Sequence, residues 1–302
     1  MKLFALIVCV FPPVYGCDRI HAAYESSPFV VYSGDSVSLV TKRLADCGWV
    51  KYPTLMYLII RLFYMGDVKA GCYYWNDGIS SRQIAQSLNR GSAFPRLRIT
   101  GGMRSSQIER MIKKTDYMDG ECPSIQEGSI LPGEYHYKPG SSRADVVSSV
   151  TRDSCVALDK IWAERPSDFP LTKAQWIVLA SIVEREGRED DYSKIAGVFM
   201  RRLSENMMLQ SCSTLLYALE RDVCYEDKVT HSHLNLDSEY NTYKVRGLPP
   251  TPICHPGSNA LRATLNPSQD GCMYFFFNKK RGEHVFSETF AEHAKLRRSN
   301  DF

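Results

Sequence analysis

Two glutamates, Glu184 and Glu186, close an apolar segment that begins at Trp176. In a helix, side chains three and four positions apart share a face. On this spacing, one apolar stripe is formed by Trp176, Leu179, Ile182 and Val183. Glu186 follows Val183 by three positions and therefore falls on the stripe, whereas Glu184 is expected to point away from it.

The expected position of Glu186 suits proton transfer. A carboxyl group on an apolar face loses hydration, which raises its pKa and allows it to hold a proton near neutral pH, as a general acid must. Gly187 follows directly and is expected to end the helix, leaving the carboxyl group near an open edge. We therefore predict Glu186 as the catalytic acid, with Glu184 as the second candidate. An ion pair of Glu186 with Arg201 or Arg202 is the alternative.

The helix that carries these glutamates is predicted to begin after Thr172, because Thr172 and Gln175 have the spacing of a capping box. We expect residues 169–302 to form a separate, mainly helical domain. Two strands are predicted near its end, at Met273–Asn278 and Glu283–Ser287.

A smaller module is expected over residues 25–96, joined to the helical domain by a linking region at residues 97–168. Apolar runs bounded by turn residues predict strands, and apolar spacings of three and four predict helices. The module then has the order strand–helix–helix–strand–helix, with elements at Phe29–Tyr32, Val37–Leu44, Pro53–Met65, Ala70–Trp75 and Ser81–Leu88. The chain is therefore predicted to belong to the α+β class.

The N-terminus has the pattern of an export signal. Lys2 precedes the apolar run Leu3–Phe11, which is shorter than the roughly 20 residues of a relaxed transmembrane helix. We expect residues 1–17 to be a signal or a short membrane anchor. Gly16-Cys17 also fits a lipoprotein cleavage site, and a buried N-terminal strand is the alternative.

Charge and cysteine content exclude several classes of function. The net charge is only +3 and the basic residues are scattered, so no nucleic-acid partner is expected. Eight of the ten cysteines follow the leader, which fits an oxidising compartment with some disulfides.

No C-x-x-C pair occurs, and His231-Ser232-His233 lacks a third ligand at metal-site spacing, so neither a metal nor another cofactor is expected. The apolar run Thr54–Met65 contains Arg61 and is too short to span a membrane.

Motifs recur in a fixed order between residues 177 and 287. They comprise Ile177–Gly187, Ile195–Leu203, Met208–Ser211, Thr214–Tyr217, Tyr240–Tyr243, Gly247–Ile253, Pro256-Gly257, Ala260–Ala263, Asn266-Pro267, Tyr274–Phe276 and His284–Ser287. In this order they resemble the YceG-like (MltG-type) endolytic murein transglycosylase family. The N-terminal module resembles that family's LysM-like subdomain, and Gly128–Tyr135 resembles its Gly-x-Leu-x-Pro-x-x-Tyr stretch. The resemblance thus spans almost the whole chain.

The resemblance implies an endolytic peptidoglycan transglycosylase, a lyase that cleaves the MurNAc–GlcNAc bond of nascent glycan strands and leaves 1,6-anhydro-MurNAc ends. One glutamate acts as acid and then as base, while the C6 hydroxyl of the muramic acid attacks within the substrate. Residues 169–302 are then the transglycosylase domain. The resemblance also implies a single-pass inner-membrane protein whose catalytic domain lies in the periplasm. Its partners are peptidoglycan glycan strands and peptidoglycan synthases (penicillin-binding proteins).

Polar residues in the matching motifs are assigned to saccharide binding and to orienting the acid, with loop scaffolding as their alternative role. They are Gln210, Ser211, Thr214, Asn241 and Tyr243. Three places depart from the family's usual residues. Cys212-Ser213 replaces Asp-Pro, Thr100-Gly101-Gly102 replaces Pro-Glu-Gly, and His255 replaces an Asn before the Pro-Gly motif. Two other functions stay open, a hydrolytic muramidase and a catalytically decayed peptidoglycan-binding protein.

Overall fold

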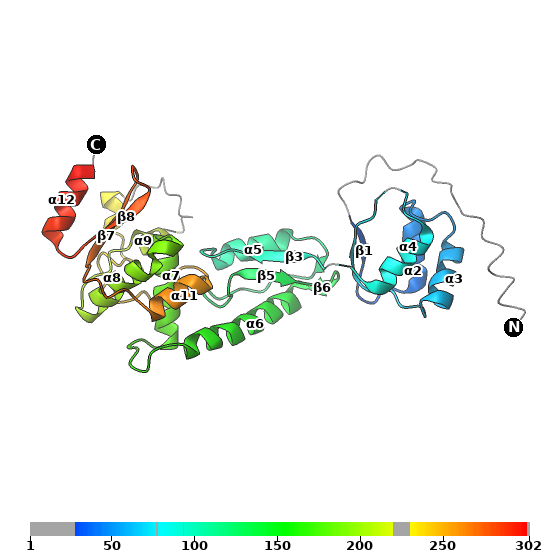
Figure 1. The fold of residues 1–302 in the computed structure, drawn as a ribbon, viewed down its shortest axis with the longest axis horizontal. Helices are drawn as coiled ribbons and strands as arrows, with labels where there is room; N and C mark the ends of the chain where they lie inside the picture. Colours follow the sequence, from blue (N-terminus) through cyan, green and yellow to red (C-terminus); the bar gives the residue numbers. More distant parts are fainter. Residues whose placement is uncertain (1–27, 77, 93, 220–229, 301–302) are drawn as a thin grey trace, which may run out of the picture. The chain divides into compact units, whose positions relative to one another are not determined.

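The computed structural model describes residues 28–76, 78–92, 94–219 and 230–300. In this part of the chain, helices are combined with short two-stranded sheets, which confirms the α+β class (Figure 1). Two compact units are present. Of the described residues, unit 1 comprises those up to Pro95 together with His136–Ser141, and unit 2 comprises Arg96–Tyr135 together with those from Ser142 onward. The leader expected at residues 1–17 lies outside the described residues.

Unit 1 packs helices against a small antiparallel sheet, in the element order that the sequence predicts. Its elements are β1 (Phe29–Val31), α2 (Val37–Asp46), α3 (Pro53–Phe63), β2 (Gly71–Tyr73) and α4 (Ser81–Arg90). The strands pair in the register Phe29↔Tyr73. α4 begins at a capping box, because Ser80 and Gln83 bond each other's backbone N–H groups. Fully buried apolar side chains from all three helices form the core, among them Leu44, Met56, Ile60, Ile84 and Leu88.

Unit 2 begins with strands and a short helix and continues into a helical assembly. Its first elements are β3 (Arg96–Ile99), α5 (Ser105–Lys114), β4 (Met118–Asp119), β5 (Gly133–His136) and β6 (Ser141–Ser142), and β3 pairs with β5. The helices that follow are α6 (Arg143–Ala163), α7 (Lys173–Glu186), the 3-10 turn η1 (Glu189–Asp191), α8 (Tyr192–Ser204), α9 (Cys212–Ala218), α10 (His231–Leu234) and α11 (Ser258–Leu265). The chain closes with β7 (Tyr274–Asn278), β8 (Glu283–Ser287) and α12 (Phe290–Asn300).

Helix α7 lies at the centre of unit 2, where it packs against α8 and α11 (Figure 1). Trp176 on α7 is fully buried between α6 and α11, and its indole Nε1 donates to the carbonyl oxygen of Leu261 at 3.0 Å. The terminal strands form an antiparallel hairpin with Tyr274 opposite Ser287, as the sequence predicts. This packing fixes α7, and with it both candidate glutamates.

Neither a membrane span nor a disulfide occurs in the described part of the chain. No helix there is long and apolar enough to cross a bilayer. The described cysteines are all free thiols: Cys47, Cys72, Cys122, Cys155, Cys212, Cys254 and Cys272. The disulfides expected from the cysteine content are therefore not formed among them. The Cys254 thiol, for example, is fully buried and donates to the carbonyl oxygen of Ser181.

Candidate active site

Glu186 is the last residue of α7, and local sequence explains why the helix has these ends. The predicted capping box is present: Thr172 Oγ1 accepts from Gln175 N, and Gln175 Oε1 accepts from Thr172 N. Gly187 leaves the helical conformation with extended backbone angles. A Cβ at Gly187 would lie 2.5 Å from Cδ1 of Ile195, so the missing side chain lets α8 pack against the end of α7.

One oxygen of the Glu186 carboxylate is held by two donors. Oε1 accepts hydrogen bonds from the hydroxyl of Ser211 and from the backbone N of Ser213, the latter at 3.0 Å. Both donors lie at the start of α9, where helical N–H groups have no partner within their own helix. Among the described residues, no hydrogen bond involves Oε2. Glu186 is half-buried, and the described residues hold its carboxylate through Oε1 alone.

Among the described residues, Glu186 forms no ion pair with Arg201 or Arg202, the alternative that the sequence left open. Arg201 donates to the carbonyl oxygen of Cys272 at 2.8 Å. Arg202 is buried and donates to the carbonyl oxygens of Met273 and Leu209 at 2.8 and 2.7 Å. Both guanidinium groups therefore bind backbone that leads into the β7–β8 hairpin and the loop before α9.

Buried hydroxyl groups hold Ser211 in place. The hydroxyls of Ser211 and Ser213 lie 2.8 Å apart. The hydroxyl of Thr242 accepts from Ser211 N at 3.0 Å and lies 2.9 Å from the hydroxyl of Thr214, which donates to Ser211 O. All four side chains are buried. Ser211 and Thr214 thus form part of the support of Glu186, and Ser211 contacts the carboxylate directly.

Gln210 has an unusual backbone conformation immediately before this network. Its φ angle is 52°, in the left-handed region that non-glycine residues seldom adopt. The conformation is maintained by a hydrogen bond of 3.0 Å from Gln210 N to Thr242 O. Strained backbone of this kind often occurs at functional sites. The Gln210 side chain is exposed.

Asn241 and Tyr243 have different positions although they belong to one motif. Asn241 is fully buried: its Nδ2 donates to Leu234 O and Leu236 O, and its Oδ1 accepts from Tyr243 N. Its contacts are those of a residue that shapes the loop. The Tyr243 hydroxyl lies 3.0 Å from Sγ of Cys212. Burial, then the neighbouring Cys212 and Glu186, raise the pKa of Tyr243, so the phenol stays protonated beside the site.

Glu184, which its helical phase places away from the apolar stripe, is enclosed by other segments of unit 2. Its Oε2 accepts from the backbone N of Gly257 at 2.9 Å, and it is also hydrogen-bonded to Tyr192. A Cβ at Gly101 would lie 2.2 Å from Oε1 of Glu184, so the chain passes close to the carboxylate on that side as well. Burial raises the pKa of Glu184, an effect that the hydrogen bonds from Gly257 and Tyr192 oppose.

Glu184 is enclosed although it lies off the apolar stripe, because α7 is buried almost all round. Val178, Ala180 and Ser181 are as inaccessible as the stripe that begins with Trp176. A helix surrounded by other elements has no single core-facing stripe, so apolar phase cannot separate a buried carboxylate from an exposed one. Glu184 faces segments distant in sequence, whereas Glu186 faces the start of α9.

A buried polar cluster that the sequence did not reveal lies elsewhere in unit 2. Nε2 of His255 is 3.0 Å from the hydroxyl of Ser105 and 3.7 Å from Oε2 of Glu127, and its Nδ1 contacts the backbone of Ile130. Burial lowers the pKa of His255 to about 4 and raises the pKa of Glu127. The arrangement is not a nucleophilic triad, because the carboxylate contacts the serine side of the imidazole, and both Ser105 and His255 are buried.

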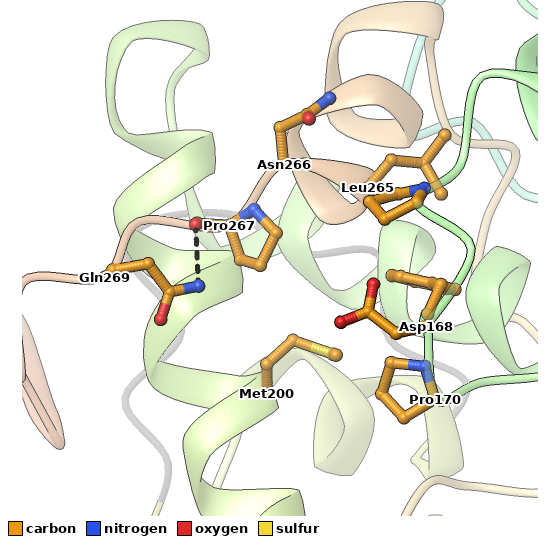
Figure 2. Close-up of a pocket in the computed structure, with 9 residues that line it drawn as sticks. Asp168, Pro170, Met200, Leu265, Asn266, Pro267 and Gln269 are labelled. Carbon is orange, nitrogen blue, oxygen red and sulfur yellow. Dashed lines mark hydrogen bonds between the residues drawn. The ribbon is translucent and has the colours of Figure 1, made fainter.

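The cavity drawn in Figure 2 is separate from the glutamates. It has a volume of about 380 Å³ and lies between the loop before α7, the side of α8 and the end of α11. Its lining is Pro166, Asp168, Phe169, Pro170, Met200, Leu265, Asn266, Pro267 and Gln269. None of the site residues predicted from the sequence lines it. No group of three or more His, Cys, Asp or Glu side chains is placed to hold a metal ion in the described part of the chain.

Comparison with known proteins gives the family of the chain. The YceG-like family matches residues 29–299, which include both units and both glutamates. The chain belongs to the YceG-like family.

Two relatives of this YceG-like chain are named endolytic murein transglycosylases. An endolytic murein transglycosylase of Bacillus subtilis is 28% identical over 301 residues, covering 88% of this chain and 82% of the relative. An endolytic murein transglycosylase of Streptococcus pneumoniae is 30% identical over 311 residues, covering 86% of this chain but only 56% of the relative. A crystal structure of a putative YceG-like protein from Listeria monocytogenes is 27% identical, with a TM-score of 0.57 over 90% of this chain and all of that one.

The departures from the YceG-like motifs lie next to partly buried carboxylates. Gly101 leaves room for Glu184, and Ser213 donates its backbone N–H to Glu186. His255 lies beside Glu127. A proline at position 213 would have no N–H to donate, so the Glu186 carboxylate has a donor here that an Asp-Pro motif cannot supply.

Proposed function

We propose that this YceG-like chain is an endolytic murein transglycosylase that cuts the MurNAc–GlcNAc bond of nascent glycan strands. The observation that carries the proposal is the geometry of Glu186. One carboxylate oxygen is fixed by Ser211 and Ser213, and the other accepts no hydrogen bond from the described residues. The relatives named endolytic murein transglycosylases support the reaction class.

Glu186 serves as acid and then as base through the same oxygen. Protonated at Oε2, it donates to the glycosidic oxygen, the bond from C1 of the muramic acid breaks, and GlcNAc leaves with a hydroxyl group. The C6 hydroxyl of the muramic acid then bonds to C1 and returns its proton to Oε2. The 1,6-anhydro ring closes, the glutamate is restored and no water is consumed. Intramolecular attack thereby replaces the second carboxylate of a hydrolytic glycosidase.

The other site residues divide into two roles. Gln210 and Tyr243 present polar groups beside the carboxylate, and we assign them to saccharide binding. Ser211 orients the acid. Thr214 holds the backbone at Ser211, and Asn241 holds the loop that contains Leu236. Glu184 is assigned to packing between α7 and the Gly257 turn rather than to chemistry.

The proposed cellular setting follows from the leader and from the N-terminal module. A signal or single-pass anchor at residues 1–17 would place the catalytic domain in the periplasm, at the inner membrane. Unit 1 is proposed as a LysM-like module that binds glycan and raises its local concentration at the site. Work beside peptidoglycan synthases (penicillin-binding proteins) would give access to nascent strands.

The test is mass spectrometry of sacculi digested with the wild type and two matched variants. We expect anhydro-muropeptides from the wild type and from Glu184→Gln, and none from Glu186→Gln. Products heavier by one water would identify a hydrolytic muramidase, and sacculus binding without products in the wild type would identify a decayed glycan-binding protein. Full activity of Glu186→Gln would overturn the assignment of the acid.

A further inference from the structure

Helix α3 of unit 1 presents an apolar face that no described element of unit 1 covers. Leu55, Leu58 and Leu62 lie on one side of the helix, at spacings of three and four residues. Their exposed fractions are 39%, 46% and 69%. The opposite side carries Met56 and Ile60, both buried in the core of the unit.

Exposed apolar side chains continue at the last residue of the helix and just beyond both of its ends. Phe63 and Met65 are 62% and 92% exposed, and Met65 adopts a left-handed φ of 55° that turns the chain after α3. Tyr52, before the first turn, is 59% exposed. We call Tyr52, Leu55, Leu58, Leu62, Phe63 and Met65 the α3 face. Scattered apolar side chains are ordinary on a protein surface, but a contiguous set on one helix marks a binding surface.

The charged residues within the segment that carries the α3 face are both basic. No acidic residue occurs between Asp46 and Asp67, and the charged residues in this interval are Lys51 and Arg61. The Arg61 guanidinium lies over the ring of Tyr57 and donates to its hydroxyl at 3.3 Å, which keeps the cation at the side of the helix. An apolar face flanked by basic side chains is the pattern of a helix that lies in the interface of an anionic membrane.

The position of α3 in the chain agrees with this partner. Ten residues, 18–27, separate the apolar leader from the first described residue, and they reach no further than about 40 Å. A leader held in the bilayer therefore keeps unit 1 close to its surface. With 11 residues, α3 is too short to cross the bilayer but long enough to lie along it.

We infer that the α3 face rests on the surface of a bilayer that contains anionic lipid, with its apolar side chains among the acyl chains and Lys51 and Arg61 at the headgroups. This inference rests on the membrane tether at residues 1–17 that is part of the proposed function. The contact would fix which side of unit 1 faces the membrane and would leave its other surfaces available to glycan.

The experiment uses the full chain with a fluorescent amino acid in place of Leu62. A matched label replaces Arg82, which is exposed on α4 in the same unit. Each protein is reconstituted with vesicles of phosphatidylethanolamine and phosphatidylglycerol with brominated acyl chains, which quench only fluorophores inserted into the bilayer. We expect quenching at position 62 at least threefold stronger than at position 82, decreasing when Leu58→Ser is added. Leu58 is exposed, so this substitution leaves the fold intact.

The outcomes separate the membrane contact from the tether. Protein that floats with the vesicles but is quenched equally weakly at both positions overturns the inference and leaves the tether standing. Weak quenching at both positions, combined with burial of the label at position 62 that increases with protein concentration, would assign the α3 face to a second copy of the chain. Protein that does not float overturns the tether and the membrane contact together. Sacculus digestion by the same preparations reports on the transglycosylase activity independently.

Discussion

The backbone N of Ser213 donates a hydrogen bond of 3.0 Å to Oε1 of Glu186. The second donor to this oxygen is a side chain, the hydroxyl of Ser211. The hydrogen bond from Ser213 N is kept whatever side chain stands at position 213, except proline, which has no N–H. The hydrogen bond from Ser211 is lost when its hydroxyl group is removed. A substitution at Ser211 can therefore loosen the hold on the Glu186 carboxylate while the carboxylate itself stays in place.

Substitution of Ser211 with Ala should lower kcat by about 10- to 100-fold. A hydrogen bond to a charged group contributes about 1.5–3 kcal/mol, and the loss falls on the group that must be aligned for proton transfer. Ser211→Thr keeps a hydroxyl and should recover part of the rate. Ser204→Ala, on the exposed end of α8, is the matched control. Rates of anhydro-muropeptide release measure the effect, and an unchanged kcat for Ser211→Ala would show that this hydrogen bond does not orient the acid.

Substitution of Gly101 with Ala should destabilise unit 2 by about 1–3 kcal/mol, because the new Cβ would lie 2.2 Å from Oε1 of Glu184. The carboxylate is held by Gly257 N, so it must break that bond to move away. Gly133→Ala is the control, since only Tyr135 approaches that position, at 3.9 Å. Denaturant unfolding measures the loss.

A double-mutant cycle identifies Glu184 as the cause. In a Glu184→Ala background, Gly101→Ala should cost much less, because the clashing atoms are gone. An equal cost in both backgrounds would place the strain in the backbone of the 100–102 turn instead.

The sequence predicts those parts of the site whose interacting residues lie close together along the chain. The ends of α7 were predicted correctly because Thr172, Gln175 and Gly187 act within one turn of the helix. The burial of Glu184 was missed because its partners Gly101 and Gly257 lie more than 70 positions away and contribute backbone, which leaves no trace in an apolar pattern. The His255 cluster was missed for the same reason.

Substitution of Asn241 with Ala should reduce stability and activity together. The buried amide satisfies the carbonyl oxygens of Leu234 and Leu236 and the backbone N of Tyr243, and each buried group left without a partner costs about 1–3 kcal/mol. Tyr243 borders Glu186, so distortion of this loop reaches the site. Glycan-binding affinity and Tm are the measurements. A fall in binding with an unchanged Tm would assign Asn241 to the saccharide rather than to the loop.

Substitution of Glu127 with Gln should stabilise the protein at neutral pH and have little effect in acid. Burial raises the folded-state pKa of Glu127 above its ordinary value of 4.5, which means that folding favours the protonated form. The favourable contribution is complete below pH 4.5 and is lost as the pH rises through the folded-state pKa, since the buried carboxyl group must then ionise. Gln is neutral throughout, and its amide oxygen still accepts from Ser105 N.

The measurement is Tm of both proteins between pH 4.5 and about pH 8. The His255 imidazole is mostly neutral over this interval because its pKa is about 4, and Glu184 is present in both proteins, so the difference in Tm reports chiefly on Glu127. The variant should gain Tm progressively with rising pH, from near zero at the acid end. Glu134→Gln, an exposed carboxylate beside Arg96, should show no such trend. A constant difference across the interval would mean that Glu127 remains ionised in the fold, with its charge compensated by the nearby Arg104 guanidinium, which lowers the pKa of Glu127.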